Sequence, residues 1–198
     1  MRGGGATLAG VRIVPEASPW DEGGEAPAWR EALHEFQWLR DLRALGGEDA
    51  RRMARTLTEA WLDRYEASSG VAWRADVMGR RISAWASHYE LFYASASDSL
   101  RLELLASMAR QARHLGRIAI SGTDGLGRIA AIKGLLYAGL CLPGEMPLLA
   151  RARRLLANEL CWQVSVDGGH VERSSRAQRV LMRDLVAMPA ALGARRNG

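Results

Sequence analysis

Apolar side chains recur at helical spacing through most of the chain, and this periodicity constrains the fold more than any other feature. Trp29, Leu33 and Phe36 lie at positions i, i+4 and i+7, which places them on one face of a helix. Because short loops join such stripes, neighbouring helices are expected to be antiparallel. The sequence therefore predicts an all-α protein of about seven helices, over residues 28–45, 48–67, 74–88, 98–118, 123–142, 145–166 and 175–188.

The region before these helices has a different composition. Residues 1–27 are rich in Gly and Pro and predict an extended or loop segment, whereas residues 28–194 are expected to form one helical domain. A chain of 198 residues, 48% of them hydrophobic, can bury one substantial core. Within the last helix, Pro189 is expected to disturb the helical backbone.

Composition excludes several classes of protein. No apolar run approaches the roughly 20 residues needed to cross a bilayer, so no membrane span is expected. Residues 1–5 carry no apolar leader, which favours the compartment of synthesis, the cytoplasm. Cys141 and Cys161 are too few for a disulfide framework and are interpreted as small core residues. The histidines within helices share no i, i+4 partner, so we expect no metal site and no cofactor.

The basic charge permits two interpretations. Arginine and lysine together number 27 against 22 acidic residues, which gives a net charge of +5 and favours an anionic partner. Because Lys133 is the only lysine, the same excess can also arise from a coding bias toward arginine. Nucleic acid is not an expected partner. The arginines lie at i, i+3 and i+4 intervals typical of a solvated helix face, without a recognised nucleic-acid motif.

One segment points to a family. Residues 163–174 read Gln-Val-Ser-Val-Asp-Gly-Gly-His-Val-Glu-Arg-Ser, and Asn-Glu-Leu precedes them at 158–160. This combination resembles the signature of heparinase II/III-like proteins. The resemblance is colinear from about Trp29 to Leu185, with further matches in family order at 36–42, 73–85, 109–115 and 134–140.

The resemblance implies the N-terminal helical domain of such a protein, an incomplete α/α toroid over residues 28–194. In full-length members a β-sandwich domain follows, and because nothing in this sequence encodes it, a truncated member is expected. The uncovered helix faces would then meet the missing β-sandwich domain or a second copy of the chain. The family also suggests the periplasm or cell envelope, so the compartment stays open.

The resemblance further implies a polysaccharide lyase, which cleaves an acidic, uronate-containing polysaccharide by β-elimination. This chemistry needs a group that neutralises the uronate carboxylate and a Tyr that acts as base and acid. By the resemblance, the Asn-His pair of active members falls at Leu126 and Gly127, and the catalytic Tyr falls at Ala177. We therefore expect weak or no activity. The alternative is a non-catalytic module that binds an anionic glycan or a cell-envelope partner.

With the usual lyase residues absent, five other polar residues form the candidate site. His170 is the catalytic candidate, and Asp167, Glu172, Arg173 and Arg128 are the candidate substrate-binding residues. The N-terminus of the helix that follows the turn would favour an anion. A structural interpretation stays open beside this one, because Asp-Gly-Gly suits any tight turn and a histidine can cap it.

Aromatic residues outside the helical stripes are the remaining ligand candidates. Trp20 and Trp73 lie at loop or helix-start positions and are expected to be freer to meet a ligand. Tyr89 and Tyr93 are the only plausible substitutes for the missing phenol. The tryptophans at helical spacing are expected in the core.

Overall fold

The computed structural model describes residues 6–8, 11–13, 20, 27–65 and 70–194, and these are almost entirely helical. A short hairpin pairs β1 (Ala6–Leu8) with β2 (Val11–Ile13) in antiparallel register. A 3-10 turn, η1 (Val71–Trp73), precedes the fourth α-helix. The all-α prediction is confirmed by the α-helices of the described chain: α1 (Pro27–His34), α2 (Leu39–Leu45), α3 (Gly47–Arg64), α4 (Ala75–Ser87), α5 (Tyr89–Phe92), α6 (Asp98–Ile118), α7 (Gly125–Cys141), α8 (Met146–Gln163) and α9 (Ser175–Ala194).

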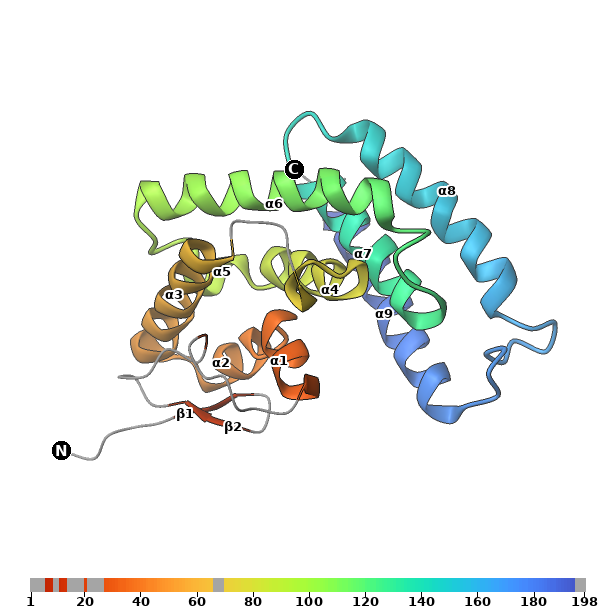
Figure 1. Cartoon of the computed structure of the whole chain (residues 1–198), viewed down its shortest axis with the longest axis horizontal. Helices are drawn as coiled ribbons and strands as arrows, with labels where there is room; N and C mark the ends of the chain where they lie inside the picture. The colour runs from red at the N-terminus through yellow and green to blue at the C-terminus, as the bar shows by residue number, and fades with distance from the viewer. Residues whose placement is uncertain (1–5, 9–10, 14–19, 21–26, 66–69, 195–198) are drawn as a thin grey trace.

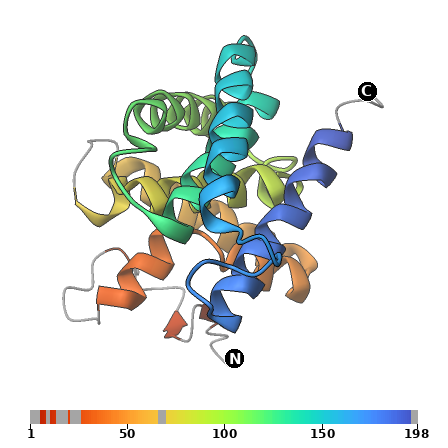
Figure 2. The same cartoon turned by 90° about the vertical axis from the view of Figure 1, so that its right-hand side faces the viewer.

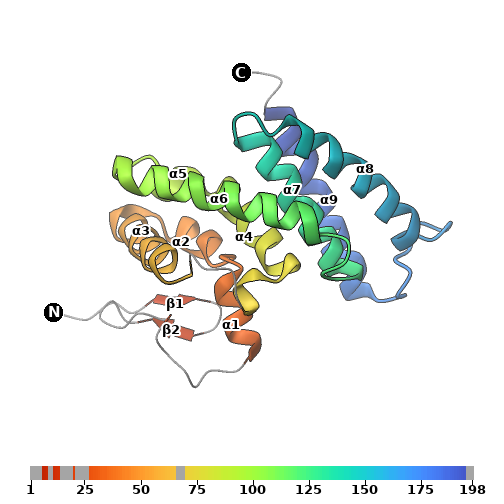
Figure 3. The ribbon, with the colours of Figure 1, turned by 45° about the horizontal axis from the view of Figure 1, so that its top comes forward.

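Helices α4 and α7 form the centre of the fold. They make the most extensive contact in the molecule, and α6 packs against both of them. Figure 1 places α6 along one side of α4 and helices α1 and α2 along the other. On the far side, α7 also contacts α8 and α9, which Figure 3 shows beside it. In Figure 2, α8 and α9 diverge from the turn that joins them. This array is compatible with an incomplete toroid, which stays a prediction.

The first predicted helix, 28–45, is two helices in the structure. The backbone of Phe36 has a φ of 59°, so the chain turns sharply between α1 and α2. Phe36 and Trp38 both enter the core, and the Trp38 indole N–H donates to the carbonyl of Leu33 at 3.0 Å. The apolar residues on the two faces of this segment are thus buried because the chain turns between α1 and α2. They do not belong to one helix that is packed on both sides.

The end of the last helix also differs from the expectation. Helix α9 continues through Pro189 to Ala194, so the proline does not end it, and the disturbance of the helical backbone there stays a prediction. A proline removes one N–H donor from the helical ladder. The residues after it can still donate to carbonyls in the preceding turn, and this is how the helix continues.

An aromatic cluster fills the space between the first helices and α4. Trp20 is 5% exposed and stacks on His34 and Phe36 with ring centroids 5.6 and 5.9 Å apart. Trp73 is buried as well, and its indole N–H donates to the carbonyl of Tyr65 at 3.2 Å. The expectation that Trp20 and Trp73 are free to meet a ligand is therefore wrong. The domain boundary at residue 28 stays a prediction, although Trp20, which precedes it, packs into the helical core.

The two cysteines also lie elsewhere than expected. Cys141 and Cys161 are both exposed, whereas their apolar character predicted that they lie in the core. Cys141 is the last residue of α7 and Cys161 lies near the end of α8. Because a helix end projects past the elements that cover its middle, apolar composition alone does not decide whether a residue there is buried.

A buried arginine, Arg81, lies within the aromatic cluster and is 0% exposed. Its Nε and Nη2 donate to Gln111 Oε1 at 2.9 and 2.7 Å, and Nη2 also donates to the carbonyl of Ala72 at 2.8 Å. Its Nη1 donates to the carbonyl of His34 at 3.1 Å, and the guanidinium lies 4.2 Å from the ring centroid of Trp61. Burial lowers the pKa of Arg81 to about 9, so the side chain stays charged at neutral pH.

The contact between α4 and α7 depends on two glycines. A Cβ on Gly79 would lie 2.2 Å from the carbonyl oxygen of Ala130 in α7. A Cβ on Gly134 would lie 2.5 Å from the Cα of Gly79. Neither neighbour is a side chain that could turn away, because both are backbone atoms. The two helices therefore approach so closely only because both positions lack a side chain.

We expect Gly79→Ala to lower the free energy of unfolding by about 3 kcal/mol, because the new methyl group forces α4 away from α7. Urea denaturation followed by circular dichroism measures the change. Gly116→Ala is the matched control: its Cβ would meet only the flexible Leu148 side chain, at 3.4 Å. Helix propensity predicts that this control is neutral or stabilises α6 by up to about 1 kcal/mol. A Gly79→Ala protein as stable as the wild type would contradict the close packing.

Candidate functional site

The turn between α8 and α9 is built around His170, which is 2% exposed. The Nδ1 atom of His170 accepts the backbone N–H of Glu172 at 3.1 Å, so Nε2 carries the proton. Nε2 lies 3.2 Å from the side-chain oxygen of Gln163 and donates to it. The backbone N–H of His170 donates to the side-chain oxygen of Gln178 at 2.6 Å. Both ring nitrogens are thus engaged within the chain.

Gln163 extends this arrangement into a buried network. Its Nε2 donates to Glu159 Oε1 and to the carbonyl of Gly125, both at 2.6 Å. The other carboxylate oxygen of Glu159 accepts from Arg128 Nη1 at 3.1 Å, and Arg128 Nε donates to the carbonyl of Thr123 at 3.3 Å. The network therefore joins the start of α7 to the end of α8 and, through His170, to the start of α9.

Of the five predicted site residues, the structure brings Arg128 and His170 into this one network. Asp167 and Arg173 form a separate, exposed ion pair. Hydrogen bonding from Arg173 lowers the pKa of Asp167, with a further contribution from the backbone N–H of Gly169. The Glu172 side chain is exposed, and one carboxylate oxygen would lie 3.4 Å from a Cβ placed on Gly125. The geometry of His170 favours the structural interpretation of the turn over ligand contact.

Sequence reasoning did not single out Glu159 and Gln163, although both belong to the motif that suggested the family. Their side chains are 6% and 3% exposed. Residues at i and i+4 share one face of a helix, so this spacing could have indicated that the pair acts together. A buried carboxylate is stable only when charged and hydrogen-bonding partners surround it, which Arg128 and Gln163 provide here.

We expect His170→Ala to lower the free energy of unfolding by about 2 kcal/mol, because it leaves buried partners on Gln163 and Glu172 without a hydrogen bond. Thermal unfolding followed by circular dichroism tests this. Arg173→Ala removes only an exposed ion pair from the same turn and should cost about 1 kcal/mol or less. Equal stability of His170→Ala and the wild type would show that the histidine does not hold the turn.

The positions at which the resemblance places lyase residues lie at the first turns of α7 and α9. Gly127 is partly buried, and a Cβ there would lie 2.2 Å from the hydroxyl oxygen of Thr123. Ala177 is 2% exposed. Tyr89 and Tyr93, the proposed substitute phenols, lie in and just after α5, with ring centroids 5.3 Å apart and ring planes tilted by 55°. Neither tyrosine lines the clefts described below.

A hollow lined mainly by charged side chains is a second candidate site, here called the basic cleft. It has a volume of about 410 Å³ and lies between the turn joining α1 to α2 and helices α4, α7 and α9. This volume is within the usual range of ligand pockets. Five cationic side chains and two carboxylates line it: Arg40, Arg80, Lys133, Arg176, Arg183, Glu35 and Asp184.

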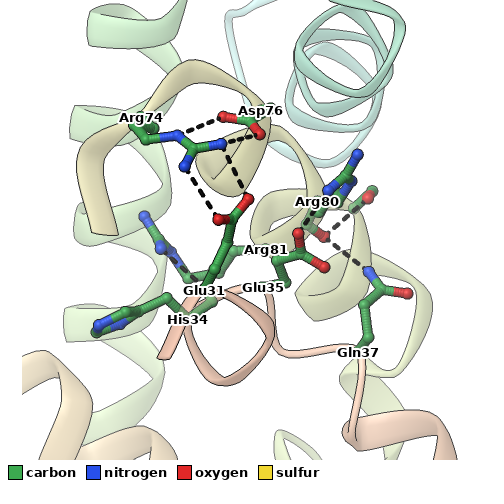
Figure 4. Close-up of polar contacts among 9 residues, drawn as sticks. Glu31, His34, Glu35, Gln37, Arg74, Asp76, Arg80 and Arg81 are labelled. Atoms are coloured by element: carbon green, nitrogen blue, oxygen red, sulfur yellow. Dashed lines mark hydrogen bonds and ion pairs between the residues drawn. The ribbon is translucent and has the colours of Figure 1, made fainter. Parts of the chain in front are cut away.

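Ion pairs neutralise part of this charge. Arg80 Nη1 lies 2.5 Å from Glu35 Oε1, a pair that Figure 4 shows beside Gln37. Burial raises the pKa of Glu35 above its usual value, and the neighbouring Arg80 partly opposes this effect. Lys133 Nζ lies 3.0 Å from Asp184 Oδ1.

Arg176 is the cationic group of the basic cleft that is most available to a ligand. It is exposed and forms no ion pair with any residue in the described part of the chain. Arg183 is also exposed and shares Asp184 with Lys133, at 3.7 Å from the carboxylate. The cleft therefore keeps an excess of positive charge on α9.

A second ion-pair cluster lies between α1 and α4 and holds one wall of the basic cleft in place. Arg74 Nη2 lies 2.9 Å from Glu31 and 2.6 Å from Asp76. Figure 4 shows this guanidinium between the two carboxylates. Because Glu31 belongs to α1 and Asp76 to α4, the pairs fix the position of α4, which carries Arg80, relative to α1, which Glu35 directly follows.

Residues 23–196 match the family described as Heparinase II/III N-terminus. The chain belongs to the heparinase II/III N-terminal family. Over 196 residues it is 34% identical to FtsZ-localized protein C of Caulobacter vibrioides (strain NA1000 / CB15N), an alignment that covers 97% of this chain and 33% of that protein. The chain thus spans about a third of the length of this relative. No solved structure matches it.

Most residues of the matching segments 36–42, 73–85, 109–115 and 134–140 are buried, whereas within 163–174 only Gln163 and His170 are. Trp85, Arg81 and Ile82 are 0–1% exposed in the centre of α4, and Gln163 and His170 belong to the network at the turn. In this chain, the resemblance therefore rests on the residues that build the fold. The basic cleft, by contrast, is lined by residues from four separate parts of the sequence, none of which the motifs singled out as a site.

The described residues of the heparinase II/III domain form neither a metal site nor a membrane span. Within the described ranges, no group of three or more His, Cys, Asp or Glu side chains is arranged to hold a metal ion. Across the same residues, no helix has the length and apolar character needed to cross a membrane.

Proposed function

We propose that this heparinase II/III N-terminal domain binds an acidic polysaccharide in the basic cleft without cleaving it. The observation that carries the proposal is the excess of cationic side chains around a hollow of about 410 Å³. Arg176 and Arg183 would bind uronate carboxylates through charge-assisted hydrogen bonds. Gln37 and Ser83, which also line the cleft, would bind sugar hydroxyls.

The alternative to binding alone is that the domain also cleaves the polysaccharide by the lyase reaction of the family. It needs a neutraliser of the carboxylate and a phenol near the C5 proton of the uronate. Leu126, Gly127 and Ala177 occupy the positions that would supply these groups. Among the described residues that line the cleft there is no tyrosine. These features support binding without elimination.

We expect the double variant Arg176→Gln and Arg183→Gln to bind an acidic polysaccharide about tenfold more weakly than the wild type, since two charge-assisted contacts are lost. Isothermal titration with polygalacturonate, alginate and heparin measures the affinity, and dextran serves as the neutral polymer. Arg153→Gln, which removes an exposed charge from α8 outside the cleft, is the matched control and should change affinity less than about twofold.

The same mixtures test the lyase reaction, because β-elimination produces an unsaturated uronate that absorbs ultraviolet light. A rise in absorbance that the wild type catalyses would overturn the non-catalytic proposal. Silence in titrations with all three acidic polymers would overturn polysaccharide binding itself. Equal weakening by the cleft variant and by Arg153→Gln would mean that the attraction is a property of the overall charge.

A second candidate function is an assembly role together with FtsZ. The relative that is 34% identical over 97% of this chain is named for its localisation with FtsZ. A group of exposed apolar side chains at the end of α8 and in the turn after it, here called the α8-end surface, supports a protein partner. It consists of Trp162, Val166 and Val171, of which Trp162 is 80% exposed. A further domain, such as the β-sandwich of the family, and a second copy of the chain are the other occupants to test.

We expect a fluorescent fusion of this chain to co-localise with FtsZ and the variant Trp162→Ser to lose this localisation, because the indole is the largest apolar group on that surface. Val186→Ser, an exposed apolar position on α9, is the matched control and should leave localisation intact. A fusion that stays diffuse in cells with assembled FtsZ would overturn this candidate. If Trp162→Ser instead abolishes self-association in light scattering while localisation persists, the surface belongs to a second copy.

A further inference from the structure

A smaller hollow, here called the α3 hollow, adjoins the basic cleft. It has a volume of about 180 Å³ and lies beside the start of α3, where α2 ends and α4 passes into α5. Two arginines, a histidine and one glutamate contribute its polar lining. The lining residues are Arg43, Gly46, Gly47, Arg51, His88, Glu90 and Leu91.

His88 connects the two hollows, because it belongs to the lining of both. The residue caps the C-terminal end of α4 and is half-buried. Burial lowers the pKa of His88, and the charges of Arg43 and Arg40 lower it further. These two arginines lie on opposite sides of the junction, since Arg40 lines the basic cleft and Arg43 lines the α3 hollow. Positive potential therefore continues across the histidine.

The cationic groups of the α3 hollow differ in how strongly they are already paired. Arg51 lies 3.7 Å from the carboxylate of Glu48, which also pairs with Arg55 at 2.9 Å. Among the described residues, Arg43 makes only a long hydrogen bond, 3.5 Å, to the carbonyl of Ser87. Arg43 is thus free to turn toward an anion at little energetic cost. Glu90 on the same lining would repel a carboxylate placed beside it, so an acidic ligand must approach from the arginine side.

We propose that the ligand is a polyanionic chain that passes from the basic cleft across His88 into the α3 hollow, where Arg43 and Arg51 bind its next acidic groups. This inference rests on the proposed polysaccharide binding and adds a second binding region, the α3 hollow, for acidic groups further along the same chain. A single sugar acid would occupy one hollow and leave the arginines of the other unused. Two hollows joined at one residue suit a chain better than a compact anion.

The test is a length series. Size-fractionated oligomers of whichever acidic polymer binds most tightly, from the disaccharide upward, are titrated into the wild type and three variants. For the wild type, affinity should rise with length until the chain reaches the α3 hollow and then level off. The double variant Arg43→Gln and Arg51→Gln should bind the disaccharide as the wild type does, but long oligomers about fivefold more weakly, as expected for exposed ion pairs.

Arg176→Gln provides the comparison within the basic cleft and should weaken binding of every length, including the shortest. Arg153→Gln again controls for net charge, and a circular dichroism melt of each variant verifies folding. If Arg176→Gln weakens binding but the α3-hollow variant binds all lengths normally, polysaccharide binding stands and the longer path is wrong. If no oligomer or polymer binds to the wild type, the proposed function itself has failed.

Discussion

The buried guanidinium of Arg81 is the interaction on which the arrangement of the N-terminal half depends. It donates to a side chain of α6 and to carbonyls of α1 and η1, and it lies against the indole of Trp61 in α3. No carboxylate among the described residues pairs with it, so neutral dipoles and an aromatic face stabilise the charge. A buried charge left without such partners is strongly unfavourable. These four elements are therefore held in one arrangement around α4.

The neighbouring residue, Arg80, points to the opposite side of this arrangement. While Arg81 enters the core, Arg80 pairs with Glu35 and lines the basic cleft. The wall of the cleft is thus held by the same helix that anchors the core, and the close contact of Gly79 with α7 brings Lys133 and α9 within reach of it. A binding surface carried on such fixed helices is preorganised, which lowers the entropy lost when a ligand binds.

The turn that carries the family motif plays a different part. His170, Gln163 and Glu159 use their polar atoms on one another and on Arg128, so the motif joins three helix ends and leaves little capacity for a ligand. This turn carries the motif that most clearly relates the sequence to the heparinase II/III family. In this chain, the accessible arginines of the basic cleft, Arg176 and Arg183, lie instead on α9.

The sequence by itself determined the all-α class, the family and most of the helices, because helical periodicity is a local property of residues three and four positions apart. It also placed Trp61 and Trp85 in the core correctly. Only the tertiary structure decided that Trp20 and Trp73 are buried and Trp162 is exposed, since burial depends on which elements cover a residue. The basic cleft could not be predicted from the sequence for the same reason. Its lining comes from segments between Glu35 and Ala187, and only the packing of α4, α7 and α9 brings those charges together.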